Sequence, residues 1–415
     1  MPQTGALTTL DQFQLAFPAR LLNGLGAGLD LVGIRVGRID AQSLIAEACR
    51  KTGLNDLGNG QFLEDYNALI GAFERNSALH LLGRLAIKQE LLRALINRLR
   101  HVDLIQQHSE ILDVPIQRPL FIVGLSRTGT TLLHKLFAQD EHMRVPPFWQ
   151  LISPFPLGVD DEEIQRRIGL AETTTRLSNY VAPLFSVIHR IDAHEPEECV
   201  FLLPHHLVYH GRGDVREYVE WFLGRSALAD YQYYKQQLQI LQWGQPARHW
   251  VMKSPFHLFQ LDALLEVFPD AGILQTQRDP SKVIPSWCSF EAAIGMMHRK
   301  RVDRQQIGKD WLALWQTAME RAMAVRASHH EARFFDIPYV ELVADPVGMM
   351  RRIYQHFGYP ITDAAEAAMQ RWLTEQSREK HGIHRYNAEQ FGLTEAGIRN
   401  EYSRYIERFG IQLEA

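Results

Sequence analysis

The strongest constraint on the fold is a turn rich in glycine and hydroxyl residues, Gly124-Leu-Ser-Arg-Thr-Gly-Thr-Thr131. The preceding run, residues 119–124, is short and continuously apolar, as expected of a buried parallel strand, and residues 130–139 follow with helical period. Gly124 and Gly129 let the backbone turn tightly, so that successive N–H groups point into one concavity. The helix that follows adds the positive end of its dipole. The sequence therefore predicts a strand–loop–helix unit that holds a phosphate-like anion.

Further along the chain, the alternation of strand and helix continues. Residues 248–253 and 272–277 are predicted strands, each followed by a helical segment. This order predicts an α/β class, with a P-loop-like three-layer fold in which helices flank a central parallel sheet. Residues 1–115 carry only helical patterns, which predicts a helical N-terminal extension before an α/β domain at 116–415. Within that domain, residues 155–245 are predicted to form a helical insertion that roofs the site.

Composition excludes some classes of function. The 415-residue chain has a net charge of −4, so it lacks the excess of positive charge that is typical of a nucleic-acid-binding scaffold. Its cysteines, Cys49, Cys199 and Cys288, are widely spaced and form no CxxC pair, which indicates reduced thiols in a cytoplasmic protein. We find no run approaching the roughly 18 apolar residues of a membrane span, and no signal peptide. A homo-oligomer is compatible with these features.

One apolar, glycine-rich segment, Leu21–Ile34, has two interpretations. It is either a helix or hairpin packed on the body, or a lid or surface element that makes peripheral contact with a membrane.

The loop differs from a nucleotide triphosphatase loop at one position. It resembles GxxxxGK[ST], but Thr130 stands where that motif has the lysine that binds the β- and γ-phosphates. The cation is instead inside the loop, at Arg127, and a fixed guanidinium suits a 5′-phosphosulfate, whose two anionic groups need no metal. A P-loop small-molecule kinase and a non-catalytic nucleotide-binding protein are the alternatives.

A second candidate anion site follows the strand at 272–277. Arg278 stands at the strand end and Ser286 eight residues later, near the start of a helix. An arginine and a hydroxyl are a natural pair for a terminal phosphate. The structural alternative is a strand-ending turn with a surface ion pair.

Together these segments resemble the sulfotransferases that use 3′-phosphoadenosine-5′-phosphosulfate (PAPS), in particular the bacterial branch with a helical N-terminal region. Residues 119–133 resemble the family's 5′-phosphosulfate loop, and Arg278 and Ser286 have the spacing of its 3′-phosphate site. Residues 251–258 resemble the segment whose lysine, here Lys253, contacts the donor. Residues 339–346 match a structural Y-x-x-L-x-x-D-P segment, and residues 384–393 resemble a C-terminal loop that closes over the nucleotide.

The resemblance implies transfer of a sulfuryl group from PAPS to a hydroxyl or amine of a small-molecule or lipid acceptor, without a metal and with 3′-phosphoadenosine-5′-phosphate (PAP) as product. It assigns Arg127 and Lys253 to the oxygens that gain charge in the transition state. The residues expected to bind the nucleotide are Ser126, Arg127, Thr128, Gly129, Thr130, Thr131, Arg278, Ser286 and Tyr386.

The chain departs from the family's eukaryotic cytosolic members at three positions. Many of these members have a lysine where this chain has Arg127, a change that keeps the charge. Their adenine-stacking tryptophan is replaced by Leu132, which leaves the adenine's partner open, and their catalytic histidine by Pro255. Residues 145–150 also lack the carboxylate that a related family of tyrosine sulfotransferases uses as base. The general base must therefore come from elsewhere.

We expect the base in the segment 192–199, within the predicted roof. His194 or Glu198 is the first choice and Glu195 the third, with His257 as the competitor outside the segment. The alternative is that 192–199 is only a solvated acidic turn, because a proline followed by two glutamates is typical of a helix start.

Three histidines, His205, His206 and His210, suggest a metal site. No cysteine or HExxH pattern accompanies them, so we expect them to line the acceptor pocket or to pack in the core.

Overall fold

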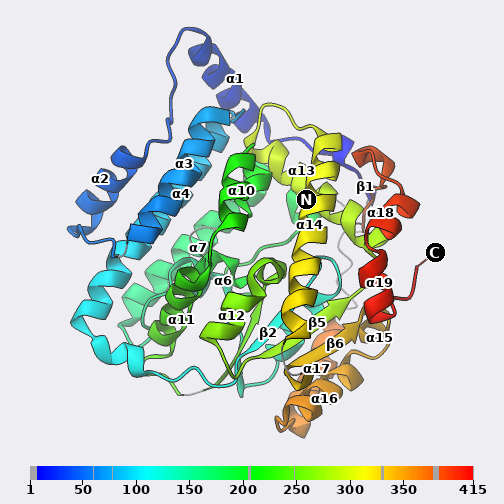
Figure 1. Ribbon diagram of the computed structural model, residues 1–415. Coiled ribbons are helices and arrows are strands. Elements are labelled where there is room, and N and C mark those ends of the chain that lie inside the picture. Colours follow the sequence, from blue (N-terminus) through cyan, green and yellow to red (C-terminus); the bar gives the residue numbers. More distant parts are fainter. Residues whose placement is uncertain are drawn as a thin grey trace.

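The computed structural model describes residues 7–58, 60–76, 78–203, 207–246, 248–328, 331–376 and 383–414. Figure 1 shows helices surrounding a central sheet, with one N-terminal helix, α1 (Phe17–Leu31), projecting from the body. The strands are β1 (Leu7–Thr8), β2 (Leu120–Gly124), β3 (Met143–Arg144), β4 (His249–Lys253), β5 (Gly272–Gln277), β6 (Phe334–Pro338) and β7 (Ile383–His384).

Helices make up most of the remaining structure. Those before the sheet are α1, α2 (Ala41–Thr52), α3 (Gly60–Asn76) and α4 (Leu81–Gln107). Those between β2 and β4 are α5 (Thr130–Phe137), α6 (Phe148–Ile152), α7 (Asp161–Val181), α8 (Phe185–Ile188), α9 (Tyr209–Arg212), α10 (Arg216–Gly224) and α11 (Leu228–Gln242). Those after β4 are α12 (Leu261–Val267), α13 (Pro280–His298), α14 (Arg304–Ala327), α15 (Tyr339–Ala344), α16 (Pro346–Phe357), α17 (Asp363–Gln376), α18 (Glu395–Glu401) and α19 (Ser403–Phe409). No helix in the described ranges is both long and apolar enough to cross a bilayer.

The central sheet has the order β3-β4-β2-β5-β6, and every neighbouring pair is parallel. The three strands predicted from apolar runs are confirmed as β2, β4 and β5. The two outer strands were not predicted, because β3 has two residues and β6 carries an exposed Asp336 in its middle. In β2, at the centre of the order, all five residues are buried.

The two faces of the sheet belong to separate apolar cores. Phe121 and Val123 of β2 pack in one core with α11, α12 and α14, whereas Leu120 and Ile122 pack in the other with α5 and α16. This alternation follows from the period of two along a strand. The predicted three-layer α/β fold is thereby confirmed.

The N-terminal helices are joined to the same core. Asp40 caps α2 as its position before a helical run suggests, because its Oδ1 accepts the backbone N–H of Ser43 at 2.8 Å. Leu91 and Leu95 of α4 belong to the core that contains Phe121. One apolar core therefore runs across residue 115, and the boundaries 1–115, 116–415 and 155–245 stay a prediction.

The parallel sheet determines where a ligand can bind. The carboxyl ends of its strands lie at one edge, and ligands of open parallel sheets bind in the crevice outside that edge. The loop 124–129 follows β2, Lys253 ends β4, Arg278 follows β5 and Tyr339 follows β6. Four chain segments from residue 124 to residue 339 thus meet at one place.

Candidate active site

The loop after β2 has the backbone of an anion cradle. Gly124 and Gly129 have φ values of 127° and 86°, and a Cβ at Gly124 would lie 2.3 Å from Thr276 Oγ1. Arg127 also has positive φ, 69°, a conformation that is uncommon for a residue with a side chain. The loop leads into α5, with Gly129 as its N-cap. Backbone N–H groups and a helix N-terminus therefore face the same space.

Most of the predicted donor-binding residues line one cavity of about 1160 Å³. Those that line it are Ser126, Arg127, Gly129, Thr130, Thr131, Arg278 and Tyr386. Thr128 is fully buried, and its hydroxyl donates to the Leu125 carbonyl at 2.6 Å, so only its backbone amide remains for a ligand.

The two predicted anion sites meet at Arg127. Its Nε donates to Ser286 Oγ at 3.2 Å, and its carbonyl accepts a hydrogen bond from Arg278 Nη1 at 2.8 Å. The Arg278 guanidinium lies over the Tyr339 ring, with Cζ 3.9 Å from the centroid. The structure thus brings the residues of the two predicted anion sites side by side, and it adds Tyr339, which the sequence analysis treated only as structural. Recognising β6 would have placed Tyr339 at the carboxyl edge of the sheet.

Lys253 is buried at the end of β4, where it pairs with Glu198. Its Nζ donates to Glu198 Oε1 at 2.9 Å, and only 2% of the lysine is exposed. Burial opposes the charge on Lys253, but the Glu198 and Glu197 carboxylates outweigh this and hold its pKa above the ordinary value. The lysine therefore stays charged beside a carboxylate that lines the cavity.

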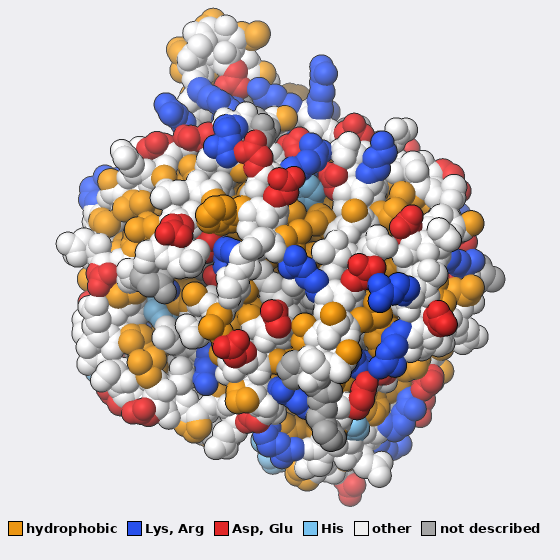
Figure 2. All heavy atoms as spheres, in the orientation of Figure 1, with side chains coloured by type: hydrophobic (Ala, Val, Ile, Leu, Met, Phe, Trp, Pro, Cys, Tyr) orange, Lys and Arg blue, Asp and Glu red, His pale blue; other side chains and the backbone are white. Residues whose placement is uncertain are grey.

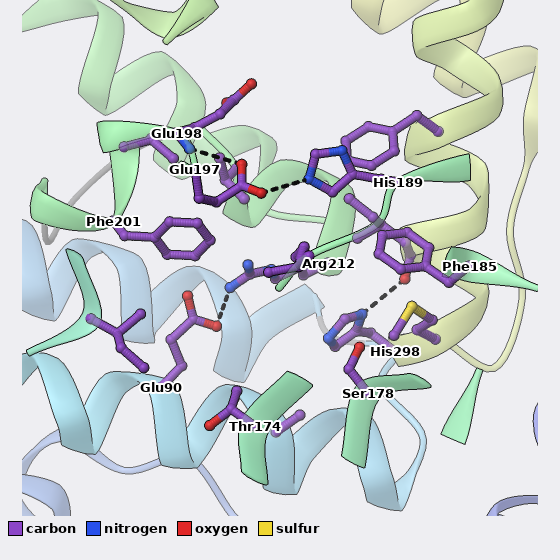
Figure 3. A pocket seen from close by; sticks show the side chains of 18 of the residues that line it. Glu90, Thr174, Ser178, Phe185, His189, Glu197, Glu198, Phe201, Arg212 and His298 are labelled. Carbon is purple, nitrogen blue, oxygen red and sulfur yellow. Dashed lines mark hydrogen bonds and ion pairs between the residues drawn. The ribbon is translucent and has the colours of Figure 1, made fainter. Parts of the chain in front are cut away.

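Glu197 is a second carboxylate at this place, which the sequence analysis did not single out. It accepts the backbone N–H of Glu198 at 2.8 Å and lies 3.3 Å from His189 Nε2 (Figure 3). Burial would raise its pKa, yet His189, Lys253 and the backbone N–H hold it at about 2. Glu197 is therefore an ionised, buried group that helps keep Lys253 protonated.

The four candidates for the general base are placed very differently. Glu198 lines the cavity, whereas His194 has a side chain 58% exposed and pairs with Glu172 of α7 at 3.0 Å. Glu195 forms an ion pair with Lys135 at 2.6 Å.

His257 is fully buried behind β4. Its ring nitrogens contact the Tyr231 hydroxyl at 2.7 Å and Cys199 Sγ at 3.1 Å. Burial lowers its pKa to about 3. Of the four candidates, the structure thus places Glu198 beside Lys253 at the cavity.

No group of three or more His, Cys, Asp or Glu residues that could hold a metal occurs in the described ranges. His205 and His206 lie outside these ranges. His210 is buried on α9, where its Nε2 lies 3.5 Å from Asp310 Oδ2.

Comparisons with known proteins agree on one family. A model described as the sulfotransferase family matches residues 119–363. A curated relative, omega-hydroxy-beta-dihydromenaquinone-9 sulfotransferase Stf3 of Mycobacterium bovis, is 25% identical over 309 residues, which cover 70% of this chain and 75% of the relative.

Two solved structures are similar over nearly the whole chain. Sulfotransferase STF1 of Mycobacterium tuberculosis H37Rv has a TM-score of 0.79 and 29% identity, with 89% of this chain and 100% of that chain covered. Sulfotransferase STF9 of Mycobacterium avium has a TM-score of 0.82 and 27% identity, with coverage of 91% and 98%. With the family match extending over the sheet and the loop 124–129, this chain belongs to the sulfotransferase family.

Proposed function

We propose that the protein transfers a sulfuryl group from PAPS to a hydroxyl or amine of a hydrophobic acceptor. The observation that carries the proposal is the single cavity that joins the cradle of loop 126–131 and Arg278 to Glu198, the partner of Lys253. Family membership supports sulfuryl transfer and leaves the kinase and non-catalytic alternatives without support.

The donor site fits a nucleotide with two separate anionic ends. Loop amides, Arg127 and the hydroxyls of Thr130 and Thr131 would hold the phosphosulfate, while Arg278 and Ser286 would hold the 3′-phosphate. PAPS supplies the sulfuryl group. Tyr386 and Tyr339 also line the cavity and are candidates for contact with the nucleoside.

The residues near Lys253 would perform the chemistry. Lys253 and Arg127 would stabilise negative charge as the bond between sulfur and the bridging oxygen breaks. Glu198 would take the acceptor's proton as the acceptor oxygen bonds to sulfur; its Oε1 binds Lys253, and no described residue donates to its Oε2. Glu197 would position Lys253 by keeping it ionised.

The acceptor part of the cavity is largely apolar, which favours a hydrophobic alcohol or a lipid. Leu82 and Ala86 of α4, Leu177 of α7, Phe185 of α8 and Ile294 of α13 line this part. Figure 2 shows α1 projecting at the top of the molecule with hydrophobic side chains on its surface. The exposed apolar side chains of α1 and the residues after it are Phe17, Leu21, Leu22, Leu25, Leu31, Val32, Ile34 and Val36.

The segment 21–34 has features of both predicted roles, a helix packed on the body and a surface element that contacts a membrane. It forms most of α1, and Gly26 packs against Leu81 of α4, yet the helix leaves a row of apolar side chains in solvent. We propose that this row makes peripheral contact with a membrane that carries the acceptor. Sedimentation with phosphatidylcholine vesicles, compared for the wild type and a Leu21→Ser/Leu25→Ser variant, tests the contact.

A thermal shift experiment tests the donor assignment. PAP and PAPS should raise the melting temperature with EDTA present, and ATP or GTP much less, because the loop lacks the lysine that binds triphosphates. Equal stabilisation by Mg-ATP, abolished by EDTA, would contradict the proposal.

A further inference from the structure

A second polar cluster lines the acceptor cavity among apolar residues. It consists of Glu90 of α4, Arg212 of α9, and Glu291 and His298 of α13. Figure 3 shows Arg212 reaching to Glu90 between the Glu197–Glu198 pair on one side and His298 on the other. Neither the anion cradle nor the Lys253–Glu198 pair uses these groups.

Arg212 is held in the cavity wall as an ion pair. Its Nη1 donates to Glu90 Oε2, and its side chain is 13% exposed. Burial opposes its charge, but the adjacent carboxylate of Glu90 keeps its pKa above the ordinary value. Within the described part of the chain, Glu90 is the one residue that accepts a hydrogen bond from Arg212. The remaining guanidinium N–H groups are thus donors for a ligand.

His298 presents an acceptor to the same cavity. Its Nδ1 contacts the Ile294 carbonyl at 2.8 Å, and because a carbonyl only accepts, Nδ1 must carry the proton. Burial lowers the pKa of the ring to about 4, so the ring is neutral at pH 7. Nε2 is therefore an unprotonated acceptor.

Glu291 is a buried carboxyl with an unsatisfied atom. It is 1% exposed, and its Oε2 has no hydrogen-bond partner among the described residues. Burial raises its pKa to about 8, so it is an uncharged O–H donor at pH 7. A Cβ at Gly211 would lie 2.0 Å from Oε2, so the carboxyl uses space that only glycine leaves free. A buried polar atom without a partner destabilises a fold and calls for a functional explanation.

We propose that Arg212, His298 and Glu291 form a distal subsite that binds a hydroxyl group of the acceptor, remote from the group that is sulfonated: the hydroxyl oxygen accepts from Arg212 and Glu291, and its proton is donated to His298 Nε2. This inference rests on the proposed function and names the substrate class more narrowly. The charges of Arg212 and Glu90 cancel, and the other two groups are uncharged. An ionic ligand group would leave an uncompensated charge in the wall, so a neutral polar group fits best.

The helix α13 gives the scale of the acceptor. Ser286, which contacts Arg127, is on the same helix as Glu291 and His298. At about 1.5 Å per residue, these two residues lie roughly 7.5 and 18 Å further along the axis. The subsite therefore suits an acceptor whose two oxygen functions are separated by an apolar chain.

Calorimetric titration of the PAP-loaded full-length protein tests the subsite. The probes are dodecan-1-ol and a set of dodecanediols with the second hydroxyl at successive positions toward the far end. We expect the best diol to bind the wild type about tenfold more tightly than dodecanol. This ratio should approach one in Glu291→Leu and in Glu90→Gln/Arg212→Gln, and Glu291→Gln, which keeps a neutral polar group, should retain it.

The outcomes separate the subsite from the proposed function. A ratio of one in the wild type, an unchanged ratio in both variants, or no binding of either probe would overturn the subsite. PAP binding and sulfuryl transfer to dodecanol test the function independently of the ratio. Glu291→Leu removes an unpaired polar atom, so the melting temperature of this variant should not fall. The binding ratio can therefore still be tested in Glu291→Leu if the Glu90→Gln/Arg212→Gln variant fails to fold.

Discussion

The Arg278 guanidinium donates two parallel hydrogen bonds to the carboxylate of Glu414, from Nε at 2.8 Å and from Nη2 at 3.0 Å. Glu414 is itself held, because its backbone N–H donates to Asp279 and its carbonyl accepts from Arg399. The C-terminal tail thus places a carboxylate on the arginine that we propose for the 3′-phosphate. A phosphate that binds Arg278 would have to share the guanidinium with the Glu414 carboxylate or displace that carboxylate.

Glu414→Gln should therefore bind PAP several-fold more tightly than the wild type, since it removes a negative charge beside the phosphate while keeping a similar shape. Calorimetry at low ionic strength measures the change. The control is Glu407→Gln, an exposed carboxylate on α19. If Glu414→Gln has wild-type affinity, the tail carboxylate does not compete with the phosphate.

Arg278→Ala should weaken PAP and PAPS alike, because both carry the 3′-phosphate. Loss of a charge-assisted contact costs about 1.5–3 kcal/mol, or roughly 10- to 150-fold in affinity. Adenosine 5′-phosphosulfate lacks that phosphate and should bind the wild type and the variant similarly. Arg404→Ala, at an arginine 79% exposed, is the matched control. Equal loss of all three ligands would mean that Arg278 supports the fold instead.

Lys253→Met should lower kcat strongly while PAP affinity stays within a few-fold, because the lysine charge matters most as the bridging oxygen becomes anionic. The variant should also be less stable, since it leaves Glu198 without its ion-pair partner and removes one of the charges that hold the buried Glu197 ionised. Lys253→Met/Glu198→Gln should recover part of that stability with no recovery of kcat. A kcat near the wild-type value at saturating PAPS would exclude a role for Lys253 in the chemical step.

Glu198→Gln should lower kcat by about 10²- to 10⁴-fold with PAP binding intact, as expected for loss of a general base. The defect should shrink across a series of phenols of increasing acidity, because these need less help in losing a proton. His194→Ala should behave like the wild type in the same series. A defect of constant size for Glu198→Gln, or a graded defect for His194→Ala, would move the base away from Glu198.

The choice between Glu198 and His194 shows where sequence reasoning reached its limit. The apolar runs and glycines predicted three strands, the loop and the position of Lys253, because these depend on residues close in the chain. His194 and Glu198 lie on one short segment, and composition does not say which side faces the cavity. An antiparallel β-bridge between Pro147 and Pro196 fixes the position of that segment. In this position His194 pairs with Glu172, and Glu198 pairs with Lys253.

Contacts between distant parts of the chain were equally hidden from the sequence. Arg278 and Glu414 are 136 residues apart, and Glu90 and Arg212 are separated by 122. Neither pair has a spacing that marks it, because the pairing depends on how helices from different regions pack around the sheet. The sequence therefore predicted the strand–loop–helix unit at residues 120–137 well, and the insertion that contributes to the cavity only as an aromatic, helical region.

The stability of the protein should fall when the pH is lowered from 7 to 5, because several histidines are buried in the neutral form. A histidine with a lowered folded pKa binds its proton in the unfolded chain first, so stability is lost as the pH falls below about 6.5. Burial lowers the pKa to about 3 for His134 and His257 and to about 4 for His80, His101 and His298.

Three acids oppose this trend, since burial raises the pKa of Glu291 to about 8, of Asp230 to about 6 and of Asp65 above its ordinary value. These groups hold protons in the folded state and so favour it as the pH falls, but the five histidines outnumber the three carboxyls. Urea unfolding between pH 7 and 5 should thus show a falling free energy of unfolding. His134→Gln should reduce the slope by up to about 1.4 kcal/mol per pH unit, while His142→Gln, at a side chain 57% exposed, is the control. A stability that rises on acidification would mean that these histidines are charged in the folded protein.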